Sequence, residues 1–343
     1  MLARNQRWRL GRRQLLAGAA GIGATAAGLV VLRGGGVPQP RWTRADPPLI
    51  GWVAPINEAE DRGVAAFRDG LREQGLIEGE NLRVAWRYAE GQPERLPGIM
   101  GELLELGVRV IVAAGNTPTQ AARSATDRVP IVSINGANPV AQGFATSLAR
   151  PGGNLTGVGG STGEALYQKA AELLAEAVPA ARRLAYIGNL VASGSPHKAV
   201  AAVAAQRGLE ALVEDVPAQA DVEPAFERVL AWGADLLVAQ NVIPVNARRE
   251  QLPELALRAG VPTASSAVVW VEAGLLLAHD YDRLAVARRG AWYVARILDG
   301  ADPGVLPFEQ PTAFVFAVNR ATLARLGLSL PEHVALQVTD WLA

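Results

Sequence analysis

Small polar residues follow short apolar runs at several places along this chain, and their types suit hydrogen bonding to a small molecule. An unbroken apolar run such as 108–114 predicts a strand covered on both faces of a sheet. In open α/β sheets, small molecules bind beyond the carboxyl ends of the strands. We therefore expect the contacting residues in the loops that follow the strands: Pro55, Asn116, Thr117, Pro118, Asn138, Asn189, Ser193, Asn241, Ser266 and Asp280.

The turn Gly115-Asn116-Thr117-Pro118 is the most informative of these loops. Glycine permits the turn, Asn or Thr can cap a helix, and Pro suits the first helical turn. Free backbone N–H groups at such a helix start favour an anion such as a carboxylate. An ordinary helix cap without a ligand is the alternative interpretation, and it applies equally to Asn138-Pro139.

Residues for metal or covalent chemistry are sparse. The chain has no cysteine, which excludes disulfides, thiolate metal sites and a cysteine nucleophile. His197, His279 and His333 are scattered without metal-ligand spacing. His279 stands beside Asp280, but no Gly-x-Ser-x-Gly elbow supplies a nucleophile, and neither a dinucleotide fingerprint nor a Walker sequence is present. We expect no cofactor, no metal and no catalysis, and an exported enzyme is the weakest alternative.

The elements that must position these loops alternate between strand and helix. Parallel strands joined by helices make doubly wound sheets, and the pattern recurs on both sides of residue 160. The predicted fold class is therefore α/β, with two doubly wound parallel-sheet lobes and a ligand cleft between them. Strands are predicted at 49–53, 82–86, 108–114, 130–134, 155–158, 184–187, 209–216, 235–239, near 262 and at 275–278, and helices at 58–74, 93–106, 196–207, 222–232, 245–259 and 282–298.

The predicted domain boundaries follow from the last long helix. It would not fit a lobe that is already complete, so we expect the chain to cross back to the first lobe. The first lobe is predicted to comprise residues 46–158 plus 282–311, and the second lobe residues 159–281 plus 312–343. Residues 1–45 are predicted to be an export leader with a flexible stretch.

The leader is basic, and the body that follows it is acidic. Residues 1–44 hold eight of the 33 basic residues and no acidic ones, which leaves 25 basic against 33 acidic residues, a net charge of −8. A basic segment before the uncharged apolar run 14–32 is typical of an export signal, and Arg12-Arg13 resembles a twin-arginine signal. A membrane anchor is the alternative, because a run of about 19 residues nearly spans a bilayer. Both interpretations predict a periplasmic body, and its acidity argues against nucleic acid as a partner.

Four segments resemble one protein family. Residues 67–75 read Phe-Arg-Asp-Gly-Leu-Arg-Glu-Gln-Gly and are followed at 78–82 by Glu-Gly-Glu-Asn-Leu, and residues 89–97 read Ala-Glu-Gly-Gln-Pro-Glu-Arg-Leu-Pro. The most specific run, at 147–157, is Ser-Leu-Ala-Arg-Pro-Gly-Gly-Asn-Leu-Thr-Gly, and 308–312 reads Phe-Glu-Gln-Pro-Thr. Over residues 48–343 the chain resembles the ABC-transporter substrate-binding proteins of the tryptophan/tyrosine transport type.

The resemblance implies a type I periplasmic-binding-protein fold that closes over a small polar ligand, such as an amino acid or a carboxylate. In some relatives a Gly-Thr-Pro turn meets the ligand carboxylate, which corresponds to Thr117-Pro118 here. Asn138-Pro139 and Gln240-Asn241 stand where relatives carry acidic residues that could hold an ammonium group. Asp280 is the remaining candidate for that role.

The resemblance also implies a partner, an ABC permease in the inner membrane to which a monomeric binding protein hands its solute. The alternative is an extracytoplasmic sensing module for a membrane receptor. It predicts the same cleft with a different partner, and transporter genes beside this one would argue against it.

Overall fold

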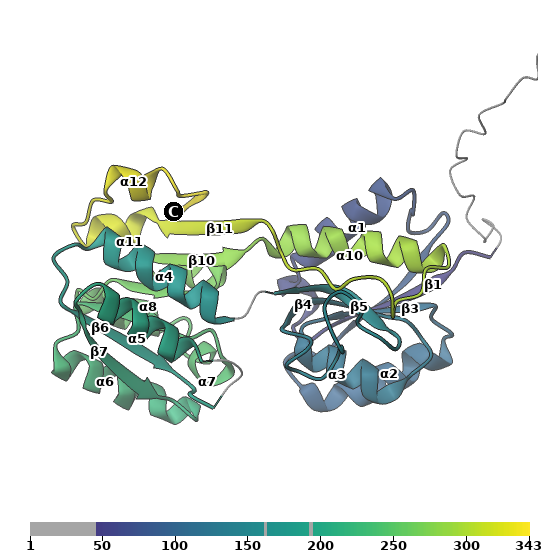
Figure 1. The fold of residues 1–343 in the computed structure, drawn as a ribbon, viewed down its shortest axis with the longest axis horizontal. Coiled ribbons are helices and arrows are strands. Elements are labelled where there is room, and N and C mark those ends of the chain that lie inside the picture. Colours follow the sequence, from purple (N-terminus) through teal and green to yellow (C-terminus); the bar gives the residue numbers. More distant parts are fainter. Residues whose placement is uncertain (1–45, 161–162, 192–194) are drawn as a thin grey trace, which may run out of the picture. The chain divides into compact units, whose positions relative to one another are not determined.

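The computed structural model describes residues 46–160, 163–191 and 195–343, so the predicted leader and Ser193 lie outside the described residues. Its strands form two separate sheets, and we call each sheet with the helices packed on it a lobe (Figure 1). The predicted fold class is confirmed: both lobes are α/β and built on largely parallel sheets.

Lobe 1 is built on a five-stranded, fully parallel sheet with the strand order β2-β1-β3-β4-β5. The chain places the first strand between two later ones, as in doubly wound sheets. The strands are β1 Leu49–Ala54, β2 Arg83–Tyr88, β3 Val110–Ala114, β4 Ile131–Ala137 and β5 Leu155–Gly160.

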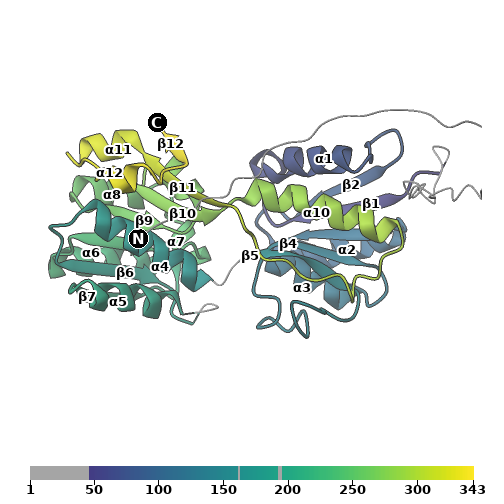
Figure 2. The same cartoon turned by 45° about the horizontal axis from the view of Figure 1, so that its top comes forward.

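Two pairs of helices cover the two faces of this sheet (Figure 1). The first pair is α1 Gly63–Glu73 and α10 Arg283–Leu298; the second is α2 Leu96–Glu105 and α3 Asn116–Ala125. Figure 2 shows α1 and α10 side by side. Their close approach requires Gly70, because a Cβ there would lie 2.5 Å from the backbone oxygen of Arg288.

Lobe 2 is built on a seven-stranded sheet with the order β12-β11-β10-β9-β8-β6-β7. Strands β6 to β10 are mutually parallel, whereas β11 is antiparallel to β10 and β12 follows the direction of β11. The strands are β6 Arg183–Gly188, β7 Glu210–Asp215, β8 Leu236–Ala239, β9 Thr263–Ser265, β10 Leu277–Tyr281, β11 Phe314–Asn319 and β12 Asp340–Leu342.

The helices of lobe 2 bury two main apolar clusters, one on each face of the sheet. The first cluster includes residues of α4 Gly163–Ala177, α5 Pro196–Gln206, α11 Arg320–Arg325 and α12 Glu332–Ala335. The second includes residues of α6 Val222–Trp232, α7 Ile243–Asn246, α8 Leu252–Arg258 and α9 Val268–Glu272.

Several predicted elements were wrong in extent. The single helix predicted at 245–259 is two helices, α7 and α8, and Pro253 lies in the first turn of the second, where its missing N–H costs no hydrogen bond. The helices predicted at 58–74 and 93–106 each begin with a short 3-10 turn, Glu58–Glu60 and Pro93–Arg95, and a third such turn spans Gln219–Asp221. Helix α4, helix α9 and the elements after residue 313 were not predicted.

The chain passes from one sheet to the other more than once. Helix α10 shares the core of lobe 1, where Val286 and Ala291 are buried with Trp52 and Phe67, although it follows β10 of lobe 2. The segment at Glu309 forms a parallel bridge with Val158 of β5 before β11 returns to lobe 2. The domain boundaries given above stay a prediction.

Within residues 46–160, 163–191 and 195–343, no helix combines the length and the apolar character needed to cross a membrane.

Candidate ligand-binding site

The turn after β3 starts a helix, as the sequence predicted. Gly115 has φ of 95°, a left-handed conformation that favours glycine, and α3 begins at Asn116. Behind the turn, the buried Thr119 hydroxyl contacts the carbonyl oxygen of Gly115 at 2.7 Å and Ser133 Oγ at 2.8 Å. Thr117 is exposed. The turn is therefore held from inside, and the Thr117 side chain stays accessible.

Asn138 lies beside a cavity of lobe 1. It follows β4, and its Oδ1 accepts a hydrogen bond from the N–H of Ala141 at 3.1 Å, so it caps a turn and not a helix. The cavity has a volume of about 400 Å³. Its wall includes Glu309, whose hydrogen bonds from Arg289 hold the pKa of that carboxyl below its usual range. The lining residues are Asn138, Pro139, Val140, Ala141, Leu148, Gly159, Phe308, Glu309 and Gln310.

Pro55 closes the first strand of the same sheet. It directly follows β1, and its carbonyl oxygen accepts a hydrogen bond from the N–H of Gly91 at 2.7 Å. This contact ties the loop after β1 to the loop after β2. Pro55 therefore shapes the edge of lobe 1 and presents no side-chain donor or acceptor.

In lobe 2, Tyr167 joins two of the predicted residues. Its buried hydroxyl accepts a hydrogen bond from the backbone N–H of Asn241 at 2.6 Å and is hydrogen-bonded to the Ser266 side chain. Burial raises the pKa of Tyr167 to about 12, so the hydroxyl keeps its proton at neutral pH. Tyr167 is on α4, which sequence reasoning missed entirely. Its only local signal is the helical spacing of apolar residues in 163–177.

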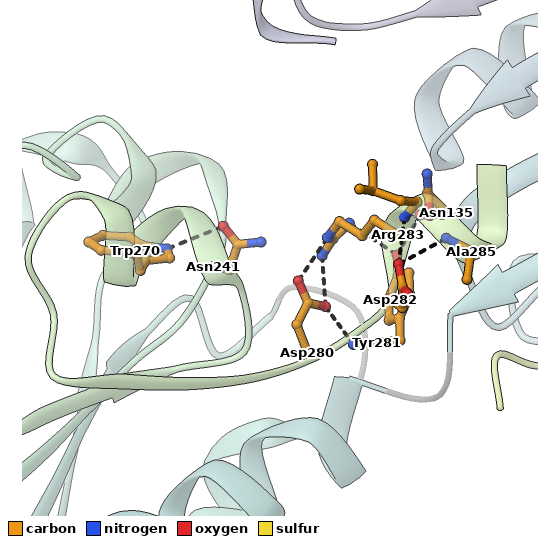
Figure 3. A network of polar contacts seen from close by, with 9 residues as sticks. Asn135, Asn241, Trp270, Asp280, Tyr281, Asp282, Arg283 and Ala285 are labelled. Atoms are coloured by element: carbon orange, nitrogen blue, oxygen red, sulfur yellow. Dashed lines mark hydrogen bonds and ion pairs between the residues drawn. The ribbon is translucent and has the colours of Figure 1, made fainter. Parts of the chain in front are cut away.

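The amide of Asn241 is oriented by a tryptophan. Trp270 is fully buried, and its Nε1 donates a hydrogen bond to Asn241 Oδ1 at 3.3 Å (Figure 3). Because the indole N–H can only donate, the amide atom that faces Trp270 must be the Asn241 oxygen. The amide nitrogen Nδ2 therefore points away from Trp270. The loop after β8 therefore presents an N–H₂ donor.

Asp280 is buried and already surrounded by donors of its own chain (Figure 3). Its Oδ2 accepts from Arg283 Nε at 2.8 Å, and its Oδ1 accepts from the N–H of Tyr281 at 2.9 Å and from Arg283 Nη2 at 3.3 Å. The backbone N–H of Val268 is a further donor. Burial raises the pKa of Asp280, and Arg283 opposes that shift. From the sequence, Asp280 was the candidate partner of a ligand ammonium group. In the structure, Arg283 already engages its carboxylate.

The structure brings some predicted residues together and separates others. Asn241, Ser266 and Asp280 follow or end the adjacent strands β8, β9 and β10, and they gather at one edge of lobe 2. Asn189 follows β6 and accepts a hydrogen bond from the N–H of Val191 at 3.0 Å, which makes it a turn residue. Asn116 and Asn138 follow β3 and β4 of lobe 1. Ser193 lies outside the described residues.

His279 and Asp280 do not act as a pair, because neighbouring residues of a strand point to opposite faces of the sheet. The ring of His279 stacks on Phe314, with centroids 5.6 Å apart and an interplanar angle of 10°. Burial, with a contribution from Lys169, lowers the pKa of His279 to about 4. Its Nδ1 is buried without a hydrogen-bond partner among the described residues. No group of three metal-ligating side chains occurs in the part of the chain that the structure describes.

His279 should make folding sensitive to acid. In the unfolded chain its pKa is about 6.5, whereas the folded protein holds the pKa near 4. The folded state therefore binds fewer protons between these values, and stability falls as the pH drops from about 6.5 to about 4. Because the ring is partly open to solvent, which weakens the effect, we expect His279 to lower the free energy of unfolding by about 1–2 kcal/mol over this pH range.

The measurement is urea unfolding at pH 8 and at pH 4 for the native chain and for His279→Phe, which keeps a ring against Phe314. The variant should lose less stability on acidification than the native chain. An NMR titration that places the pKa of His279 near 6.5 in the folded protein would contradict the prediction.

Solved structures with this architecture are numerous, and several are substrate-binding proteins. The chain superposes with a TM-score of 0.75 on an ABC domain in complex with L-Trp from Streptococcus pneumoniae, at 20% identity, covering 87% of this chain and 100% of that one. It superposes with a TM-score of 0.71 on the ligand-free, open form of a substrate-binding protein with adhesive properties from Clostridium difficile, at 21% identity, covering 86% and 99% of the two chains. These similarities show a shared fold.

Sequence comparison identifies the family. The family model described as ABC transporter substrate binding protein matches residues 53–341. A tyrosine-binding protein from Clostridioides difficile is 22% identical over 271 residues, which cover 78% of this chain and 77% of that protein.

Two parallel-sheet lobes with polar residues at the carboxyl ends of their strands define a binding-protein architecture. This chain belongs to the ABC transporter substrate-binding protein family. The resemblance drawn from the sequence is thus confirmed. Proteins of this family bind small molecules and deliver them to ABC permeases.

Proposed function

We propose that this protein is the periplasmic binding component of an ABC uptake system, that it acts as a monomer, and that it carries a small polar ligand to a permease in the inner membrane. One observation carries the proposal: both sheets end in loops of small polar residues, and the strands behind them are apolar. Ligand contacts to both lobes would favour a closed state by shifting a population that already exists.

The proposed ligand is an amino acid or another small carboxylate. The similar proteins named above include a tyrosine-binding protein and a complex with L-Trp, which supports this class of ligand. Helix α3 starts at Asn116 and Thr117, and a helix start favours an anionic group. The proposed binding residues are those predicted from the sequence other than Asp280, whose carboxylate Arg283 engages, and Tyr167 supports Asn241 and Ser266.

Export is proposed from the leader. Arg12-Arg13 and the apolar run behind them support the twin-arginine route, and either cleavage or retention of this segment leaves the body in the periplasm. Replacing both arginines with lysine and locating the protein by fractionation tests the route.

The most direct experiment is mass spectrometry of small molecules that co-purify with the protein, followed by a thermal-shift screen of amino acids and organic acids. A ligand recovered unchanged at one equivalent supports the proposal. Chemical turnover of that ligand would contradict it.

Thr117→Ala should weaken ligand binding and leave stability nearly unchanged. Thr117 is exposed in the first turn of α3, so its hydroxyl is available to a ligand. The loss of one neutral hydrogen bond corresponds to roughly a 2- to 10-fold rise in Kd. Isothermal titration calorimetry with the co-purified ligand measures the change.

Ser124→Ala is the matched control, because it removes an exposed hydroxyl from the far end of the same helix. Its Kd should equal that of the native chain. An unchanged Kd for Thr117→Ala as well would show that Thr117 only belongs to the helix start.

A further inference from the structure

Arg283 is held in one orientation at the start of α10 and still faces solvent. Its Nε and Nη2 donate to the two oxygens of Asp280, and its Nη1 donates to the Tyr281 hydroxyl at 3.0 Å. Its guanidinium carbon also lies 4.7 Å from the centre of the Tyr281 ring. Even so, 42% of the Arg283 side chain is exposed. A fixed and exposed guanidinium is suited to bind an anion, because little side-chain freedom is lost on binding.

Two donors of Arg283 remain. A guanidinium has five N–H groups, and within the part of the chain that the structure describes Asp280 and Tyr281 accept three of them. The remaining two are on the terminal nitrogens Nη1 and Nη2, one on each. An arginine commonly binds a carboxylate through paired donors of this kind.

Asn241 adds a donor on the same side. With its oxygen held by Trp270, its amide nitrogen points toward the side on which Arg283 and Asp280 lie (Figure 3). Asp280 already receives Arg283 and backbone N–H groups, and the Tyr281 hydroxyl donates to the carbonyl oxygen of Asn135 at 3.3 Å. The buried Oδ1 of Asn135 is an acceptor without a hydrogen-bond partner among the described residues. Arg283 and Asn241 themselves therefore offer only N–H donors to a ligand.

We propose that Arg283 and Asn241 select the ligand by binding an anionic oxygen group, a carboxylate in the first instance, and that Asp280 orients Arg283 and does not receive a ligand ammonium group. The inference rests on the proposed function and names its ligand class. A ligand ammonium at this position would meet N–H donors, whereas a carboxylate accepts from both residues.

The test uses three matched sets of probes, built on L-tryptophan, L-tyrosine and L-leucine. Each set holds the free amino acid, its N-acetyl derivative, which keeps the carboxylate and loses the ammonium, and its carboxamide, which does the reverse. Calorimetry should show that the N-acetyl derivative of the best-bound amino acid stays within about 3-fold of the parent, while its carboxamide binds at least 10-fold more weakly. A carboxamide that binds as tightly as the parent would overturn the inference.

Arg283→Gln should raise the Kd of the carboxylate probes by about 10- to 100-fold, which corresponds to a lost charge-assisted contact. It should leave the Kd of the carboxamide unchanged. Arg283→Lys keeps the charge without the paired donors and should lie in between. Arg128→Gln is the control, because the Arg128 side chain is 94% exposed, and it should bind like the native chain. Equal affinity of the native chain and both Arg283 variants, with melting temperatures unchanged, would refute the role of Arg283.

The co-purified small molecule separates the two proposals. If it is bound at one equivalent and carries no anionic group, the inference on Arg283 is wrong and the binding function stands. If no small molecule is bound and no probe binds, both are wrong.

Discussion

Gly157→Ala is expected to destabilise lobe 1 by about 3–5 kcal/mol, because it combines overpacking with backbone strain. Gly157 is in β5 with φ of 149°, and a Cβ at this position would lie 1.9 Å from the carbonyl oxygen of Ser133 on β4. The backbone on the other side is also engaged, since the Gly157 oxygen accepts from the N–H of Glu309 at 2.9 Å. The atoms that the new Cβ would meet are backbone atoms of Ser133, which cannot swing away as a flexible side chain could, so the two strands must separate.

Urea unfolding followed by far-UV circular dichroism measures the effect. Gly98→Ala is the matched control: Gly98 is in α2, nothing lies within 4 Å of its Cβ position, and alanine there should stabilise the helix by roughly 0.5–1 kcal/mol. A loss below about 1 kcal/mol for Gly157→Ala would mean that β4 and β5 tolerate a wider spacing.

Trp52→Ala is the second substitution with a large expected effect: it should lower the free energy of unfolding by about 3–5 kcal/mol. Trp52 is in β1 and 1% exposed, and its ring packs on Phe67 and Trp86 at centroid distances of 4.8 and 5.5 Å. Its Nε1 also donates to Asp61 Oδ2 at 2.8 Å. Alanine would leave a cavity between the sheet and α1, and it would remove a donor from a partly buried carboxylate.

Trp52→Phe separates these two contributions. It keeps most of the ring contacts and loses only the donor to Asp61, so we expect a loss of about 1–3 kcal/mol. Both variants are followed by urea unfolding. Equal losses for Trp52→Ala and Trp52→Phe would show that the hydrogen bond to Asp61, and not packing, accounts for the effect.

The motif that carried the family resemblance has a physical explanation in part. The run at 147–157 ends in Gly157, whose close approach to Ser133 excludes any side chain. In the same run, Asn154 Nδ2 donates to the carbonyl oxygens of Thr126 and Val129, which ties the start of β5 to the loop before β4. These residues specify the edge of a sheet, so they identify the fold and do not name a ligand.

The candidate site was predictable only in outline. The loops after the strands were located correctly because apolar runs mark buried strands, and a parallel sheet collects its carboxyl ends at one edge. The state of each side chain in those loops was not predictable. Asp280 was interpreted as an available carboxylate, and the structure pairs it with Arg283.

By itself, the sequence determined the alternation of strand and helix, the two-lobed class of fold, and the polar character of the loops, because these follow from periodicity within short windows. Only the tertiary structure decided which polar atoms remain available. Tyr167 contacts Asn241 across 74 positions of the chain, and Tyr281 contacts Asn135 across 146. Such pairs leave no local pattern, and even the pairing of Asp280 with Arg283 depends on where β10 ends and α10 begins.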